Sequence, residues 1–306
     1  MLAGPRGAER VHPNVILAVL SLAGAVYVVL SSAVIPALPT LQHSLNASET
    51  GVTWLLTGFL LSASVGTAII GKLGDMYGKQ RLLVVTLLTL AGGTLLAALS
   101  TSLGMLIVAR VIQGMAGGIF PLAFGIARDE FPATRVAGSI GLMSAILGVG
   151  GGLGLVVGGL IDEHLNWHWL FWIPLPIMVA AAACAWRFIP ESPVRSPGRV
   201  NWAAAALMTT GLSAVLIGIA QTTSWGWTGP QTLALLAFGL AVCVVWIIVE
   251  LRSSPLIDMT MMRVRGVWTA NLAAFLVGAG LYAWFLLLPQ LAQLPRSTGF
   301  GYGSRS

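Results

Sequence analysis

The residues best suited to chemistry form a short string of glycines and charged side chains between two long apolar runs. The string reads Gly71-Lys72-Leu73-Gly74-Asp75-Met76-Tyr77-Gly78-Lys79-Gln80-Arg81. Glycines allow a tight turn between antiparallel helices, and an acid beside a helix start is stabilised by the helix dipole. Asp75 can therefore pair with a basic group of a neighbouring helix, a contact that is made and broken when helices move. The alternative is a solvated turn with ordinary charges.

A second candidate lies inside an apolar run, where a charge is costly. Its members are spaced so that they share one helix face: Arg110, Gln113, Gly114, Gly117 and Gly118. A charge within a membrane span costs at least ~2.5 kcal/mol, so Arg110 must face protein or a wet cavity. We predict a polar cavity face, with a partner for Arg110 from outside the first six runs, from a bound anion or from backbone carbonyls. The alternative is a helix-packing face with a snorkelling arginine.

A third pattern consists of glycines in the fifth apolar run. These are Gly141, Gly150, Gly154, Gly158 and Gly159. The middle three recur every four residues and therefore line one helix face. Small residues at this spacing let two membrane helices approach closely.

These residues need long apolar helices to position them. Hydrophobic residues make up 57% of the chain and charged residues only 8%, against about 25% charged residues in a soluble domain. Apolar runs of about 18 residues or more predict membrane-spanning helices, because backbone polar groups find no water in hydrocarbon. Nine such runs are expected, at residues 15–35, 52–70, 82–99, 103–126, 136–161, 170–189, 203–220, 232–249 and 267–288. The predicted fold class is an all-α integral membrane helix bundle.

The basic residues fall mostly on one side of these spans. Thirteen of the sixteen do so: Arg6, Arg10, Lys72, Lys79, Arg81, Arg128, Arg135, Arg187, Arg195, Arg199, Arg252, Arg263 and Arg265. This positive-inside pattern places the N-terminus in the cytoplasm and predicts a multi-pass protein of the cell membrane. The sequence pI near 10.0 then reports membrane topology, and we expect no nucleic-acid partner.

Signs of an enzyme or a metal site are weak. Cys184 and Cys243 both lie within predicted spans and have no disulfide or metal-ligand spacing. We find no paired histidines, no Gly-x-Ser-x-Gly elbow and no clustered acids for hydrolysis. We therefore expect no catalytic residue, no metal and no cofactor. The acids at the ends of the fourth and fifth runs, Asp129, Glu130, Asp162 and Glu163, are expected to be solvated.

The glycine and charge string resembles the signature loop of the major facilitator superfamily, G-x-L-a-D-x-x-G-r-k-x, and lies between the expected two spans. It matches at Gly71, Leu73, Asp75, Gly78, Lys79 and Arg81. The fourth run resembles the family's R-x-x-q-G motif. The fifth run resembles its antiporter motif G-x8-G-x3-G-P-x2-G-G, which is associated with exporters, except that Leu155 replaces the proline.

Weaker segments resemble the fourteen-span drug:proton antiporter branch of that superfamily. They include Trp167–Ile173, Ser224–Trp227, Pro255–Asp258 and Thr298–Gly301. That branch often carries an acid in its first span shortly before an Ala-Leu-Pro. This chain has Ala37-Leu38-Pro39 but no acid in the first run, which leaves the proton-binding residue unassigned.

The resemblance implies a division of the chain into five segments. These are a cytoplasmic tail at 1–13, an N-terminal six-helix bundle at 14–189, a cytoplasmic linker at 190–201, two inserted helices at 202–250, and the first helix of an incomplete C-terminal bundle with a tail at 251–306. About nine spans instead of fourteen suggest a truncated chain.

The function implied is proton-coupled efflux of small hydrophobic or amphipathic molecules, such as drugs or antibiotics, by alternating access. The expected partners are the lipid bilayer, the substrate and the proton. One alternative is an uptake symporter of the same fold. Another is a non-transporting membrane fragment that assembles with a partner chain. The glycine spacing of the fifth run favours efflux over uptake.

Overall fold

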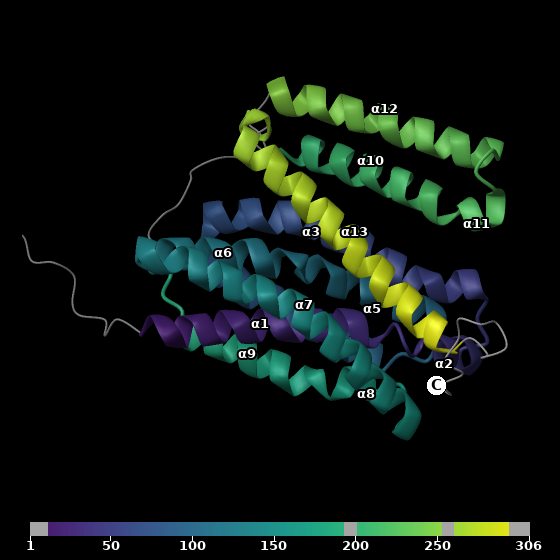
Figure 1. Cartoon of the computed structure of the whole chain (residues 1–306), viewed down its shortest axis with the longest axis horizontal. Helices are drawn as coiled ribbons and strands as arrows, with labels where there is room; N and C mark the ends of the chain where they lie inside the picture. The colour runs from purple at the N-terminus through teal and green to yellow at the C-terminus, as the bar shows by residue number, and fades with distance from the viewer. Residues whose placement is uncertain (1–11, 193–200, 253–259, 294–306) are drawn as a thin grey trace, which may run out of the picture.

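The computed structural model describes residues 12–192, 201–252 and 260–293, and every regular element in these ranges is helical (Figure 1). The elements in chain order are α1 (Pro13–Ala33), α2 (Leu38–Ser44), α3 (Glu49–Tyr77), α4 (Lys79–Ala98), α5 (Leu103–Met115), η1 (Ala116–Gly118), α6 (Ile119–Glu130), α7 (Ala133–His164), α8 (Trp169–Trp172), α9 (Pro174–Phe188), α10 (Trp202–Ala220), α11 (Thr222–Trp225), α12 (Pro230–Arg252), η2 (Met261–Arg263) and α13 (Arg265–Gln293).

The predicted all-α membrane bundle is confirmed. Within the described ranges, eight helices are long and apolar enough to cross a membrane. Their positions agree with the first eight apolar runs to within a few residues, except that the second span extends further. The ninth run lies within α13.

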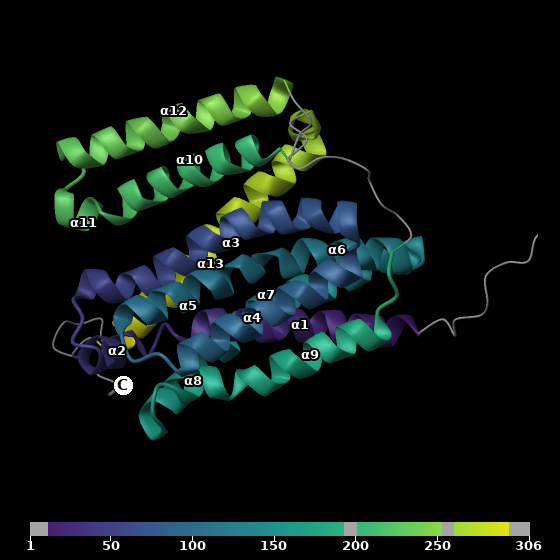
Figure 2. The same cartoon turned by 180° about the vertical axis from the view of Figure 1, so that it is seen from behind.

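The helices α1 to α9 pack side by side around a shared apolar core (Figures 1 and 2). In this bundle α1 contacts α7 and α9, α3 contacts α5, and α4 contacts both α5 and α9. The largest fully buried apolar side chains include Leu20, Leu55, Leu87, Leu106 and Phe171. The core thus draws on α1, α3, α4, α5 and α8, and it holds these helices together.

A separate pair of helices lies beside the bundle. The helices α10 and α12 run antiparallel against each other, and α10 contacts α3 (Figure 2). The close approach within the pair depends on glycines, because a Cβ at Gly211 would lie 2.7 Å from the sulfur of Cys243. We propose that this pair corresponds to the two inserted helices expected at residues 202–250.

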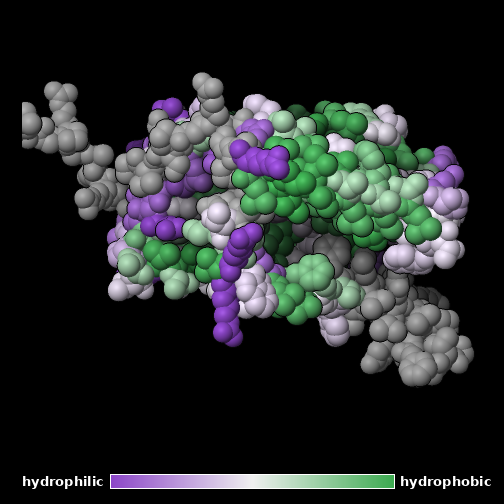
Figure 3. Space-filling view, turned by 90° about the horizontal axis from the view of Figure 1, so that it is seen from above, coloured by the Kyte–Doolittle hydropathy of each residue, from purple (hydrophilic) through white to green (hydrophobic). Residues whose placement is uncertain are grey.

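The outer surface is apolar over much of its length. Large exposed apolar residues on α12 include Leu233, Phe238, Leu240 and Val244. In Figure 3 apolar side chains gather over the right-hand part of the visible face, and hydrophilic ones lie mainly on its left and near its centre. Exposed apolar side chains on long helices suit contact with lipid.

One expectation about local structure was wrong. The supposed loop at residues 71–81 is nearly all helix, because α3 continues to Tyr77 and α4 begins at Lys79. The fourth run is a single span, Leu103–Glu130, as expected, and it contains the short 3-10 segment η1 between α5 and α6. Glycine has low helix propensity, and η1 contains Gly117 and Gly118.

The orientation of the bundle can be tested with single cysteines after Cys184 and Cys243 are replaced by serine. Ala133 and Glu163 are exposed residues near opposite ends of α7. We expect Glu163→Cys to react with an impermeant thiol reagent in intact cells, and Ala133→Cys to react only after the membrane is permeabilised. Labelling of the position-133 cysteine from outside would reverse the proposed topology.

Candidate functional site

The turn between α3 and α4 consists of a single residue, Gly78. Its φ is 112°, a conformation that side chains with a Cβ rarely adopt. A Cβ at this position would also collide with the carboxylate of Glu191, which lies just after α9. The glycine therefore permits both the tight turn and the close approach of the chain that follows α9.

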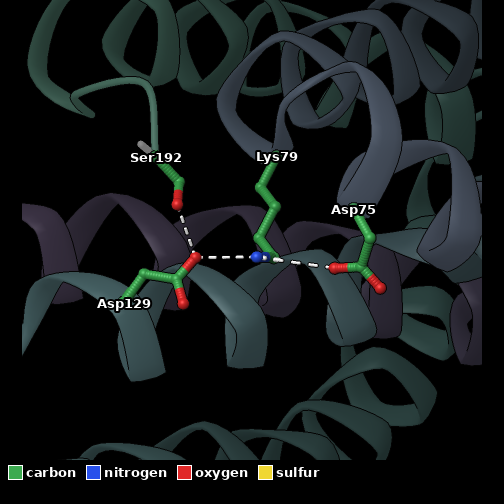
Figure 4. A network of polar contacts seen from close by, with 4 residues as sticks. All are labelled: Asp75, Lys79, Asp129 and Ser192. Atoms are coloured by element: carbon green, nitrogen blue, oxygen red, sulfur yellow. Dashed lines mark hydrogen bonds and ion pairs between the residues drawn. The ribbon is translucent and has the colours of Figure 1, made fainter. Parts of the chain in front are cut away.

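The charges of this turn form a network with two other parts of the chain (Figure 4). The ammonium nitrogen of Lys79 lies 2.7 Å from Oδ2 of Asp129 at the end of α6, and 3.4 Å from Oδ1 of Asp75. The hydroxyl of Ser192 donates to the same Asp129 oxygen at 2.6 Å. One carboxylate thus connects the start of α4, the end of α6 and the segment after α9.

The two ends of this network differ in exposure. The side chains of Lys79 and Asp129 are 10% and 11% exposed, whereas that of Asp75 is 50% exposed. The Lys79 stem crosses Gly125, where a Cβ would lie 2.8 Å from the lysine Cε. Removing one partner from a buried ion pair leaves the other charge uncompensated. Lys79 and Asp129 therefore depend on each other, while Asp75 remains accessible to other groups.

Neighbouring contacts hold the same turn in place. The Gln80 amide donates to the carbonyl of Trp186 at 3.2 Å, and Nε of Arg81 lies 3.4 Å from Oε2 of Glu191. The other motif members are Gly71, where a Cβ would touch Pro121 at 3.5 Å, and the half-buried Leu73. The motif thus fixes α3 and α4 against α6 and α9.

Sequence reasoning missed three members of this site. Asp129 was expected to be a solvated helix end, yet its side chain is 11% exposed and ion-paired. Ser192 and Glu191 had no assigned role. Their only sequence signal was a position directly after a span, on the side that carries the basic residues.

The second candidate, Arg110, is fully buried with Gln113 inside the bundle. Its guanidinium donates to Oε1 of Gln113 at 2.9 Å and to the backbone carbonyl of Leu55 at 3.3 Å. It also lies 4.2 Å above the ring of Phe59, a favourable cation–π geometry. The sequence left three kinds of partner open for Arg110, and one of these, the backbone carbonyl, is present in the structure. A role in a substrate cavity stays a prediction.

This polar group extends across the bundle to α4. Gln113 donates through Nε2 to the hydroxyl of Thr94 at 3.1 Å, and Thr94 donates to the carbonyl of Leu90 at 2.8 Å. All three side chains, Arg110, Gln113 and Thr94, are 0% exposed. The charge is therefore held by a continuous chain of hydrogen bonds.

The glycines of the fourth run form the contact with α3. A Cβ at Gly114 would collide with the Phe59 carbonyl, one at Gly117 would lie 2.8 Å from the Ala63 carbonyl, and one at Gly118 would collide with Ile70. These three glycines thus lie in a helix-packing contact with α3, and the predicted cavity face stays a prediction.

The glycines of α7 divide into two groups. A Cβ at Gly154 would collide with the Ser32 hydroxyl, one at Gly158 would collide with the Ala33 carbonyl, and one at Gly150 would lie 3.3 Å from Val28. These three form the close contact with α1. Gly141 and Gly159 have nothing within 4 Å of an added Cβ, so their roles stay predictions.

A family model described as Major Facilitator Superfamily matches residues 20–304. The chain belongs to the Major Facilitator Superfamily. It is 29% identical over 78% of its length to the "Tetracenomycin C resistance and export protein" of Streptomyces glaucescens, and 27% identical over 78% to "Multidrug resistance protein 3" of Bacillus subtilis. It is 30% identical over 90% of its length to "Efflux pump dotC" of Dothistroma septosporum.

The chain spans about half the length of these superfamily relatives, covering 45%, 48% and 49% of them. Among solved structures, a peptide transporter called POT in complex with sulfate has a TM-score of 0.57 at 18% identity. That match covers 82% of this chain and 55% of the other. At this identity it shows a shared fold.

The close contact between α1 and α7 can be tested by substituting two glycines of α7. We expect Gly158→Ala to lower the melting temperature in detergent, because its new methyl group collides with the Ala33 backbone. Gly152→Ala is the matched control, since nothing lies within 4 Å of its Cβ, and a gain of up to ~1 kcal/mol in helix propensity is expected there. Equal melting temperatures for the two variants would contradict the proposed contact.

The buried arginine can be compared with an exposed arginine of the same bundle. Arg110→Ala removes the donor to Oε1 of Gln113, and an unsatisfied buried polar group costs about 1–3 kcal/mol. Arg128 is exposed, so Arg128→Ala is expected to change stability by no more than about 0.5 kcal/mol. Both are measured by thermal unfolding of purified protein. Similar small losses in both variants would show that Arg110 is solvated.

Proposed function

We propose that this superfamily member works as an efflux transporter for small hydrophobic or amphipathic molecules, coupled to protons by alternating access. The observation that carries this proposal is the network of Lys79, Asp75 and Asp129 at one end of the bundle (Figure 4). The direction of transport is supported by the printed names of the relatives, which describe export and efflux, and by the close glycine contacts on α7.

The network suits a protein that alternates between two arrangements. Lys79 and Asp129 are nearly buried and join helix ends within the bundle, whereas half of the Asp75 side chain is exposed. Such an exposed acid can pair with a second group in one arrangement and release it in the other. We propose that Asp75 is the group whose contacts change and that Lys79 and Asp129 hold it in position.

We assign the remaining parts of the chain as follows. Residues 14–189 form the N-terminal bundle, residues 202–250 the inserted helices, and the segment from 251 begins the C-terminal bundle. The end that carries the network faces the cytoplasm, in accordance with the distribution of basic residues. Since α1 contains no acid, we expect the proton-binding carboxylate outside α1.

Efflux can be measured with the complete reading frame that encodes this chain, in cells that lack their own drug pumps. We expect expression to lower the accumulation of a fluorescent amphipathic dye, and a protonophore to abolish this effect. Asp75→Asn is expected to reduce the efflux rate at least about tenfold. Its expression should be nearly unchanged, because exposed substitutions rarely alter stability by more than about 0.5 kcal/mol.

Glu163→Gln is the matched control, since it removes one exposed carboxylate from the opposite end of the bundle. It should transport like the parent. Higher dye accumulation on expression would favour uptake instead of efflux. Full activity of Asp75→Asn would mean that the network has only a structural role.

A further inference from the structure

A cavity of about 290 Å³ lies between the beginnings of α1 and α7, and none of the four network residues Asp75, Lys79, Asp129 and Ser192 lines it. Its polar lining comes from Asn14 of α1 and from Thr134, Arg135 and Ser139 of α7, and its apolar lining includes Phe131. Sites for drug-sized ligands begin at about 300 Å³. The cavity therefore has room for a small polar group.

Ser139 is a largely buried residue that lines the cavity. The residue is 6% exposed and lines the cavity, and it makes no hydrogen bond among the residues that the structure describes. Other hydroxyls in the spans, such as Thr86 and Thr94, donate to the carbonyl four residues earlier. The Ser139 hydroxyl has no such partner among the described residues, so it is available to donate to a group in the cavity.

The electrostatics of the cavity favour an anion. Within the described ranges Arg135 makes no ion pair, and its side chain makes one hydrogen bond, from Nη1 to Oδ1 of Asn14 at 3.3 Å. The helix α7 begins after Pro132 without a side-chain cap and with no acid in its first turn. Free N–H groups at such a helix start attract anions. The nearest acid in sequence, Glu130, does not line the cavity.

We propose that this cavity binds a phosphate group. The guanidinium of Arg135 and the hydroxyls of Ser139 and Thr134 donate to the phosphate oxygens, and the start of α7 adds its dipole. The group comes either from the headgroup of an anionic phospholipid or from phosphate in solution. Phosphate binding here does not depend on the direction of transport, because the cavity lies at one end of the bundle and outside the proposed network.

Binding is tested with purified full-length protein in two arms. In detergent, inorganic phosphate is titrated at constant ionic strength and the melting temperature is recorded. In nanodiscs, the melting temperature in phosphatidylglycerol is compared with that in phosphatidylcholine. Stabilisation by inorganic phosphate supports the site with a soluble source. Stabilisation by phosphatidylglycerol alone supports it with a lipid source, and no stabilisation in either arm would overturn the proposal.

Substitutions of the residues that line the cavity test whether any stabilisation by phosphate arises there. Arg135→Gln is expected to weaken binding about tenfold, because a charged hydrogen bond is lost, and Ser139→Ala about fivefold. Arg128→Gln removes the same charge from an exposed position at the same end of the bundle and should bind like the parent. Arg135 is itself exposed, so its variant should fold. If Arg135→Gln bound phosphate as the parent does, the assignment would be wrong.

Discussion

The structure depends on one constraint, which is that a charge placed away from water needs a partner within the protein. The chain has few charges, and the most deeply placed of those that the structure describes have such partners. Lys79 and Asp129 meet at one end of the bundle, and Arg110 is bonded to Gln113 and to backbone carbonyls in its interior. Because an unpaired buried charge is costly, breaking these contacts without new partners would destabilise the bundle.

The pairing of these charges also depends on glycines, because close contacts between helices bring each polar group within hydrogen-bonding distance of its partner. Gly114 and Gly117 bring α5 and η1 against α3, so that Arg110 reaches the carbonyl of Leu55. Gly125 lets the Lys79 stem cross α6 to Asp129. A methyl group at Gly114 or Gly117 would collide with the backbone of α3, and one at Gly125 would displace the Lys79 side chain from its path to Asp129. Tight packing and charge pairing are therefore parts of the same arrangement.

Much of this fold could be predicted from the sequence, because long apolar runs have only one stable backbone form in a membrane. The helices α1, α4 and α10 lie within two or three residues of their predicted runs. The turn at Gly78 was predicted as part of a longer loop, since the string of small and charged residues gives no sign that α3 continues to Tyr77. The composition of the site was harder to predict, because its contacts join residues far apart in the chain. Asp129 pairs with Lys79 fifty residues away, and the hydroxyl of Ser192 reaches the same carboxylate from a third segment.

If Lys79 and Asp129 stabilise the bundle as a pair, a double-mutant cycle measures their coupling directly. The free energy of unfolding is determined for the parent, for Lys79→Met, for Asp129→Asn and for the double variant. We predict that the double variant loses less stability than the two single losses combined, with a coupling of about 1–3 kcal/mol. Additive losses would contradict the pairing, because they would mean that each charge is stabilised independently of the other.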